Sequence, residues 1–142
     1  MGLEKCKKYE TCGLLILRVV VGLIFLLAGY AKLFSVTPDS FASGLAGAGV
    51  PLALLFAWVV AIAEFIGGIL LILGAFVRWT SIPLIAIMVV AIITKWFGNF
   101  GSEGFTDFGI WRLDLLLFAA LIVLLHSGAG KWALEKTWKK KV

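Results

Sequence analysis

Four long runs of apolar residues dominate the chain, at about residues 13–34, 52–76, 80–97 and 110–127. A helix needs roughly 20 mostly apolar residues to cross about 30 Å of hydrocarbon, and each run approaches this length. The runs lack the alternation of strands, and a bilayer tolerates no unpaired backbone, so helices are expected rather than barrel strands. The pattern therefore predicts an all-α integral membrane protein, a bundle of four transmembrane helices.

The composition agrees with this interpretation. Of the 142 residues, 62% are hydrophobic and 15% are charged, and the mean hydropathy is +1.08. Four spans and their short connections use nearly all of this length, which leaves no room for a soluble catalytic domain. We therefore expect a single multi-pass domain over residues 1–142, embedded in the lipid bilayer of the cell membrane.

The basic residues predict the orientation of the bundle. The net charge of +5 comes mainly from the two ends of the chain, which is typical of topology signals and not of a nucleic-acid footprint. We therefore expect no nucleic-acid partner. Most Lys and Arg fall on one side of the four spans, so both termini are expected in the cytoplasm with a tight turn around Arg78. The basic residues of that side are Lys5, Lys7, Lys8, Arg78, Lys131, Lys136, Lys139, Lys140 and Lys141.

Two connections are then expected on the outer side, at 35–51 and 98–109. In the first, Thr37 is a suitable helix cap and Pro38 suits a first turn, so a short interfacial helix is predicted. The second interleaves Phe with Gly, a composition suited to an apolar flap at the level of the lipid headgroups.

The first two spans carry stripes of small residues that are interrupted by charge. Helical spacing aligns Arg18, Gly22, Phe25, Gly29 and Lys32 on the first span, and Ala57, Ala61, Glu64, Gly68 and Ala75 on the second. Such stripes can pack closely against each other. A bare carboxylate near the bilayer centre costs several kcal/mol, so Glu64 must be protonated, paired or in contact with water. Arg18 is the expected partner, because its long side chain can reach toward the midplane.

The ionisable residues of the spans divide by depth into two predicted layers. The inner candidate site is Arg18, Glu64 and His126, and the outer cluster is Lys32, Lys95, Arg112 and Asp114. Intramembrane charges are candidates for proton relays, ligand counter-charges or pore linings. The alternative is that they are structural pins that fix helix register.

Metal and haem sites find no support in the sequence. Cys6 and Cys12 are too few to hold zinc or an iron–sulfur cluster, and their spacing is not that of a dithiol oxidoreductase. His126 is the only histidine, so one chain cannot form a bis-histidine haem site. No phosphate loop or Ser-His-Asp set is present, so any enzymatic role would be that of a subunit.

Several short segments, in this order, resemble the DoxX family of small four-helix membrane proteins. They are Leu17-Arg18 with Gly22, Phe25, Gly29, Lys32 and Leu33; Gly49-Val50-Pro51; Glu64 with Gly67-Gly68 and Leu73-Gly74; and Gly128-Ala129-Gly130 with Trp132, Leu134 and Glu135. The chain departs from the family near its end, where Ala133-Leu134-Glu135 stands in place of Ser-Leu-Asp.

The resemblance implies a membrane subunit of a redox system, as in a thiosulfate:quinone oxidoreductase. A quinone or a small sulfur compound would bind inside the bundle near Glu64 and Arg18, with quinone as the candidate cofactor and other membrane or redox subunits as partners. Two alternatives stay open. One is a scaffold whose glycine stripes dock onto a larger complex, and the other is a small anion or proton transporter, for which a homo-oligomer would supply the pore.

Overall fold

The computed structural model describes residues 2–35, 38–47, 49–98 and 108–128, with side chains at 12–35, 38–47, 49–94 and 112–128. Over these residues the only regular elements are helices. They are α1 (Gly2–Tyr30), the π-helical turn η1 (Ala31–Ser35), α2 (Pro38–Gly47), α3 (Ala53–Leu73), α4 (Val77–Gly98) and α5 (Phe108–Ser127). The predicted all-α class is confirmed. The predicted flap at 98–109 and the cap residue Thr37 lie outside the described residues.

Among the described residues, three segments are long and apolar enough to cross a membrane, namely Cys12–Ser35, Ala53–Leu73 and Val77–Thr94. They match the first three predicted spans to within a few residues. The chain is therefore a multi-pass helical membrane protein in contact with lipid. Two boundaries differ from expectation, since α1 begins well before residue 13 and α4 already begins at Val77.

The turn between α3 and α4 lies at Gly74–Phe76, slightly earlier than the predicted turn around Arg78. Gly74 adopts a left-handed conformation with φ of 70°. The N–H groups of Gly74 and Ala75 donate back to the carbonyls of Leu71 and Leu70 at 3.1 and 3.0 Å. This arrangement satisfies carbonyls that the helix end leaves open, and it reverses the chain within three residues.

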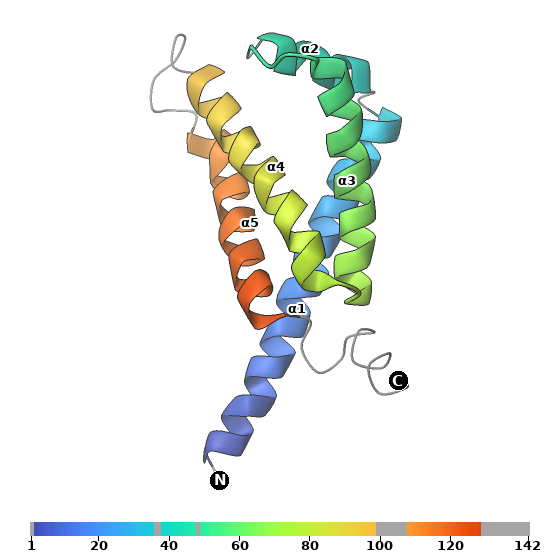
Figure 1. Ribbon diagram of the computed structural model, residues 1–142. Helices are drawn as coiled ribbons and strands as arrows, with labels where there is room; N and C mark the ends of the chain where they lie inside the picture. The colour runs from blue at the N-terminus through green and yellow to red at the C-terminus, as the bar shows by residue number, and fades with distance from the viewer. Residues whose placement is uncertain (1, 36–37, 48, 99–107, 129–142) are drawn as a thin grey trace.

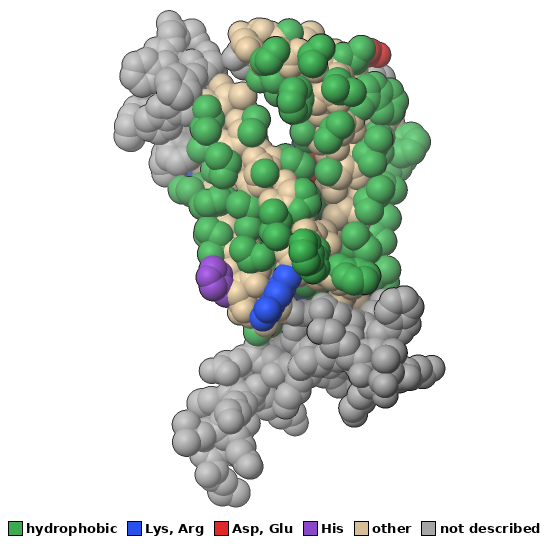
Figure 2. All heavy atoms as spheres, in the orientation of Figure 1, with side chains coloured by type: hydrophobic (Ala, Val, Ile, Leu, Met, Phe, Trp, Pro, Cys, Tyr) green, Lys and Arg blue, Asp and Glu red, His purple; other side chains and the backbone are tan. Residues whose placement is uncertain are grey.

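The helices form two antiparallel pairs, α1 with α3 and α4 with α5. The pairs converge at the end that carries the α3–α4 turn, and they diverge toward the end covered by α2 (Figure 1). A core of large apolar side chains fills the region of convergence, including Phe25, Leu71, Leu84, Leu121 and Leu124. Apolar side chains also cover most of the outer face (Figure 2), as a surface in contact with lipid requires.

The predicted small-residue stripes pack directly against each other in the α1–α3 pair. A Cβ atom added to Gly29 would collide with the backbone of Phe65, and one added to Gly68 would collide with the backbone of Leu26. At Gly22 an added Cβ would lie 2.9 Å from the carbonyl oxygen of Gly68. Glycines therefore let the two backbones touch, which is how helices gain packing energy in lipid.

The connection between α1 and α3 contains the predicted short helix. α2 begins at Pro38, as expected, with Asp39 in its first turn, where a carboxylate complements the helix dipole. Pro38 and Ala42 are buried against the rest of the protein. α2 packs mainly on α3 and lies across the end of the bundle (Figure 1).

The glycine contacts predict how substitutions affect stability. Gly29→Val and Gly68→Val must push the backbones of α1 and α3 apart, so each is expected to lower the free energy of unfolding by about 1–3 kcal/mol. Thermal unfolding in detergent, followed by tryptophan fluorescence, measures this loss. Gly13→Val is the matched control, because nothing lies within 4 Å of a Cβ at that position. Equal melting of the Gly13 and Gly29 variants would contradict the packing argument.

Candidate functional site

A cavity of about 660 Å³ lies between the two helix pairs, beneath α2. Pockets of roughly 300–1,000 Å³ hold drug-sized ligands. The lining is mostly apolar and comes from every described α-helix. Among the described lining residues, the polar side chains are those of Lys32, Glu64, Thr94 and Asp114.

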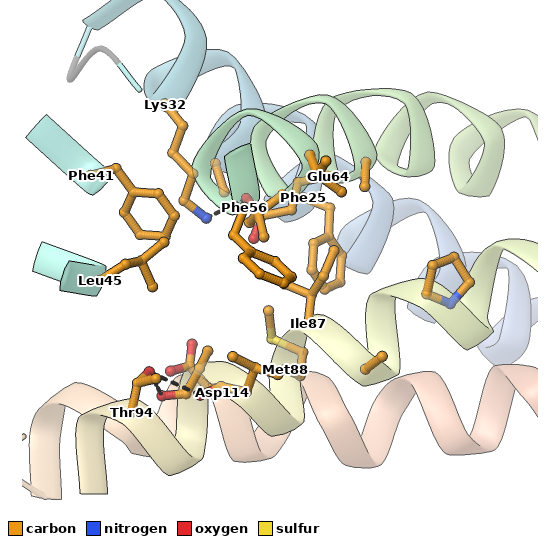
Figure 3. Close-up of a pocket in the computed structure, with 18 of the residues that line it drawn as sticks. Phe25, Lys32, Phe41, Leu45, Phe56, Glu64, Ile87, Met88, Thr94 and Asp114 are labelled. Carbon is orange, nitrogen blue, oxygen red and sulfur yellow. Dashed lines mark hydrogen bonds and ion pairs between the residues drawn. The ribbon is translucent and has the colours of Figure 1, made fainter. Parts of the chain in front are cut away.

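Lys32 and Glu64 form an ion pair on one wall of this cavity. Glu64 is 2% exposed, whereas the Lys32 side chain is 22% exposed and extends from η1 down to the carboxylate (Figure 3). The ammonium group also lies 4.9 Å from the centre of the Phe41 ring of α2, a cation–π contact. One lysine thus connects α1, α2 and α3 at the cavity.

The glycine contacts between α1 and α3 explain why Lys32 meets Glu64. Lys32 follows Gly29 by three residues, and Glu64 precedes Phe65, on which Gly29 packs. The contact thus leaves about one helical turn between Lys32 and Glu64, and the long lysine side chain spans it. The π-helical turn that contains Lys32 inserts an extra residue into α1 at this point, a feature that is frequent at functional sites.

The opposite wall carries Asp114 of α5 and Thr94 of α4 (Figure 3). Asp114 is 9% exposed. The Thr94 hydroxyl donates to the carbonyls of Val90 and Ala91 at 2.9 and 3.1 Å, so it remains close to its own helix. The cavity therefore has an ion pair on one side and a carboxyl group on the other, with apolar side chains between them.

Arg18 lies elsewhere, which corrects the expected pairing of Arg18 with Glu64. Its guanidinium group packs at the C-terminal end of α3, where a Cβ on Gly74 would lie 2.7 Å from Cζ of Arg18. Gly74 is ten residues beyond Glu64, or about 15 Å along the helix. Arg18 is buried, and its charge complements the carbonyls that end α3.

His126 and Arg112 are not among the described residues that line the cavity. His126 is exposed in the last turn of α5, about 18 Å along that helix from Asp114, with Nδ1 2.9 Å from the Ile122 carbonyl. Arg112 is exposed as well, and the side chain of Lys95 lies outside the described residues. The structure thus joins Lys32, Glu64 and Asp114, drawn from both predicted layers, around one cavity.

Sequence reasoning missed the aromatic part of the site. Phe25, Phe41 and Phe56 line the cavity from α1, α2 and α3. Phe25 was assigned to a packing stripe, and Phe41 belongs to a helix that was expected only to lie at the interface. A usable signal was the amphipathic character of α2, since its apolar face must cover something.

The DoxX family model matches residues 13–97 of the chain. An uncharacterised membrane protein of Mycobacterium tuberculosis is 34% identical over 133 residues, which cover 88% of this chain and 80% of that protein. An uncharacterised protein of Haemophilus influenzae is 33% identical over 139 residues, which cover 98% of this chain and 100% of that protein. No solved structure matches the chain. The family match contains Lys32 and Glu64, whereas Asp114 lies beyond it.

The buried ion pair predicts strong coupling between its two members. Lys32→Met leaves the Glu64 carboxylate buried without its cation, and a broken buried pair typically costs about 3–5 kcal/mol of stability. The double variant K32M/E64Q is expected to lose less than the sum of the single variants, because it leaves no uncompensated charge. Thermal unfolding of all four combinations measures the coupling. Asp39→Asn, at an exposed site, is the control and should change stability little. Additive losses at Lys32 and Glu64 would contradict the coupling.

Proposed function

The chain belongs to the DoxX family of membrane proteins, and from this premise we propose that it is the membrane subunit of a redox system and binds a lipid-soluble quinone in the cavity. The observation that carries the proposal is the cavity itself. It is an apolar chamber of about 660 Å³ whose polar side chains include an ion pair. Ligand sites are commonly of this kind, apolar with a few polar groups that orient the ligand.

A quinone suits this lining better than a small sulfur anion does. An anion needs several donors or cations, and the only cation among the described lining residues, Lys32, already pairs with Glu64. A neutral quinone ring needs apolar walls, and its oxygens need hydrogen-bond donors. The aromatic side chains of Phe25, Phe41 and Phe56 provide walls of that kind, against which a ring can stack.

Reduction of a quinone consumes protons as well as electrons. In the proposal a partner redox subunit supplies the electrons, and the cavity residues bind the ring and handle protons. Lys32 donates a hydrogen bond to a quinone oxygen, and Glu64 is the proton donor and acceptor beside it. Asp114 lies on the far wall of the same chamber, and its carboxylate is the candidate acceptor for the O–H that the second ring oxygen carries after reduction.

The packing of α1 on α3 bears on the scaffold alternative. That alternative used the glycine stripes as docking surfaces for a larger complex. The contact between α1 and α3 already buries the glycines of these stripes, namely Gly22, Gly29 and Gly68, so they offer no surface to a partner. The quinone proposal does not need them to be exposed.

The proposal includes four spans with both termini in the cytoplasm. α5 has 20 residues, which correspond to about 30 Å of helix, and it runs antiparallel to α4. The start of α1, the α3–α4 turn and the end of α5 lie at the end opposite α2 (Figure 1). Arg78 lies in the first turn of α4 at that end, as the positive-inside rule requires of a cytoplasmic side.

Cysteine labelling tests this orientation. In a C6S/C12S background, S43C puts a thiol on the exposed surface of α2, and it is expected to react with a membrane-impermeant maleimide in intact cells. The C6S variant, which keeps the exposed Cys12, is expected to react only after the membrane is opened. Labelling of Cys12 in intact cells would contradict the orientation and leave quinone binding untouched.

Quinone retention tests the function. Protein purified in mild detergent from quinone-containing cells is expected to carry quinone, which solvent extraction and chromatography quantify. Glu64→Gln removes the carboxylate that holds Lys32 in place, so the Lys32 hydrogen bond to the ring should be lost. Loss of a hydrogen bond worth about 1.4 kcal/mol weakens binding about tenfold. Asp39→Asn is the control, and K32M/E64Q separates lost binding from lost stability because it leaves no unpaired charge. Quinone-free wild-type protein that also fails to bind added quinone would overturn the proposal.

A further inference from the structure

The residues that line the cavity fall into two groups by exposure. Phe25, Glu64 and Met88 form a deep wall and are between 1% and 4% exposed. Phe56, Val59 and Val90 also line the cavity, yet they are between 47% and 54% exposed. Most of the exposed members belong to α3 and α4, and the others are Pro51, just before α3, and Leu113 of α5. The cavity therefore opens toward the surface through the space between α3 and α4, where most of its exposed lining residues lie.

The space between α3 and α4 is closed on the side of the α3–α4 turn. Gly67 of α3 packs on Leu84 of α4, where an added Cβ would lie 3.1 Å from the leucine methyl carbons. From that contact the two helices separate toward Phe56 and Thr94, about 15 Å farther along each helix. α2 covers the upper end with Phe41 and Leu45. Figure 2 shows the hollow between α3 and α4 below α2, bordered by apolar side chains.

We propose that this opening is a side portal through which the ligand's isoprenoid tail extends into the bilayer while the ring stays in the cavity. The inference rests on the proposed function and adds how the ligand is oriented and how it reaches the site. A volume of about 660 Å³ encloses a drug-sized body and not a full isoprenoid tail. The tail then leaves between α3 and α4, where most of the exposed lining residues face lipid.

The buried side of the cavity is polar and its rim is apolar, which fits a ring held inside and a tail that points outward. The polar groups Lys32, Glu64 and Asp114 lie on the buried side, where a ring oxygen gains hydrogen bonds in an apolar medium. The rim is made of Phe and Val side chains. An apolar tail can pack against them without burying an unpaired polar group. A ligand dissolved in the hydrocarbon can therefore enter sideways without crossing water.

A photoreactive quinone with a diazirine at the end of its tail locates that end directly. In purified protein, crosslinks are expected on the exposed rim of α3 and α4 near Phe56, Val59 and Val90, and an excess of plain quinone should suppress them. Competed crosslinks on α2 or on the outward faces of α1 and α5 would overturn the portal and leave quinone binding intact. Suppression by phospholipid as strong as by quinone would also overturn it, because the portal would then hold lipid chains.

Bulky substitutions at the rim give a second test. V59W/V90W fills the portal, and retained quinone is expected to fall at least about tenfold, because overpacking excludes the tail. I62W/V89W is the matched control, since both residues are exposed on the same two helices and neither lines the cavity. The control is expected to retain quinone within about twofold of the wild type. Equal retention by the two double variants would overturn the portal.

The two proposals fail in different ways. If quinone binding itself is absent, the wild-type protein gives neither retained quinone nor a competed crosslink, and both proposals fall. If quinone is retained and Glu64→Gln weakens it while the rim variants do not, the function stands and the portal falls. The melting temperature of V59W/V90W shows whether this variant is folded. If it is not, the crosslinking experiment alone tests the portal.

Discussion

Where Gly29 packs on Phe65 and Gly68 packs on Leu26, the backbones of α1 and α3 touch, and this contact fixes how the two helices align. Any larger side chain would separate the helices and let them slide. The alignment brings Lys32 to Glu64 near one end of the pair and Arg18 to the end of α3 near the other. A buried charge in hydrocarbon is tolerable only with such a partner, so the position of each charge in the bundle follows from the glycine contacts.

Much of this architecture could be predicted from the sequence because it depends on local patterns. Continuous apolar runs gave the helices, spacing gave the small-residue stripes, and Pro38 gave the start of α2. The partner of Glu64 could not be predicted in this way. Depth along a span allows Arg18 or Lys32, and only the alignment of α1 against α3, which depends on contacts between distant residues, decides between them.

The position and shape of the cavity could not be predicted from the sequence pattern either, because the cavity arises where the two helix pairs diverge. Large side chains such as Leu84 and Leu124 fill the end where the pairs converge, whereas at the other end α2 lies across the bundle and packs mainly on α3. Lys32 connects α2 with α3, since it contacts Phe41 of α2 and pairs with Glu64 of α3. The same ion pair that holds α1 to α3 thus forms part of the cavity wall, so structural and binding roles need not be alternatives.

Pro83 lies inside α4, next to Leu84 at the closed end of the separation between α3 and α4. Proline has no N–H to donate to the carbonyl of Trp79, so α4 lacks one backbone hydrogen bond at this point. A helix bends most easily where such a bond is missing. From Pro83 to Gly98 the helix extends about 22 Å, so a bend of only about 5° displaces its far end by roughly 2 Å. A bend at Pro83 would therefore change the width of the proposed opening between α3 and α4.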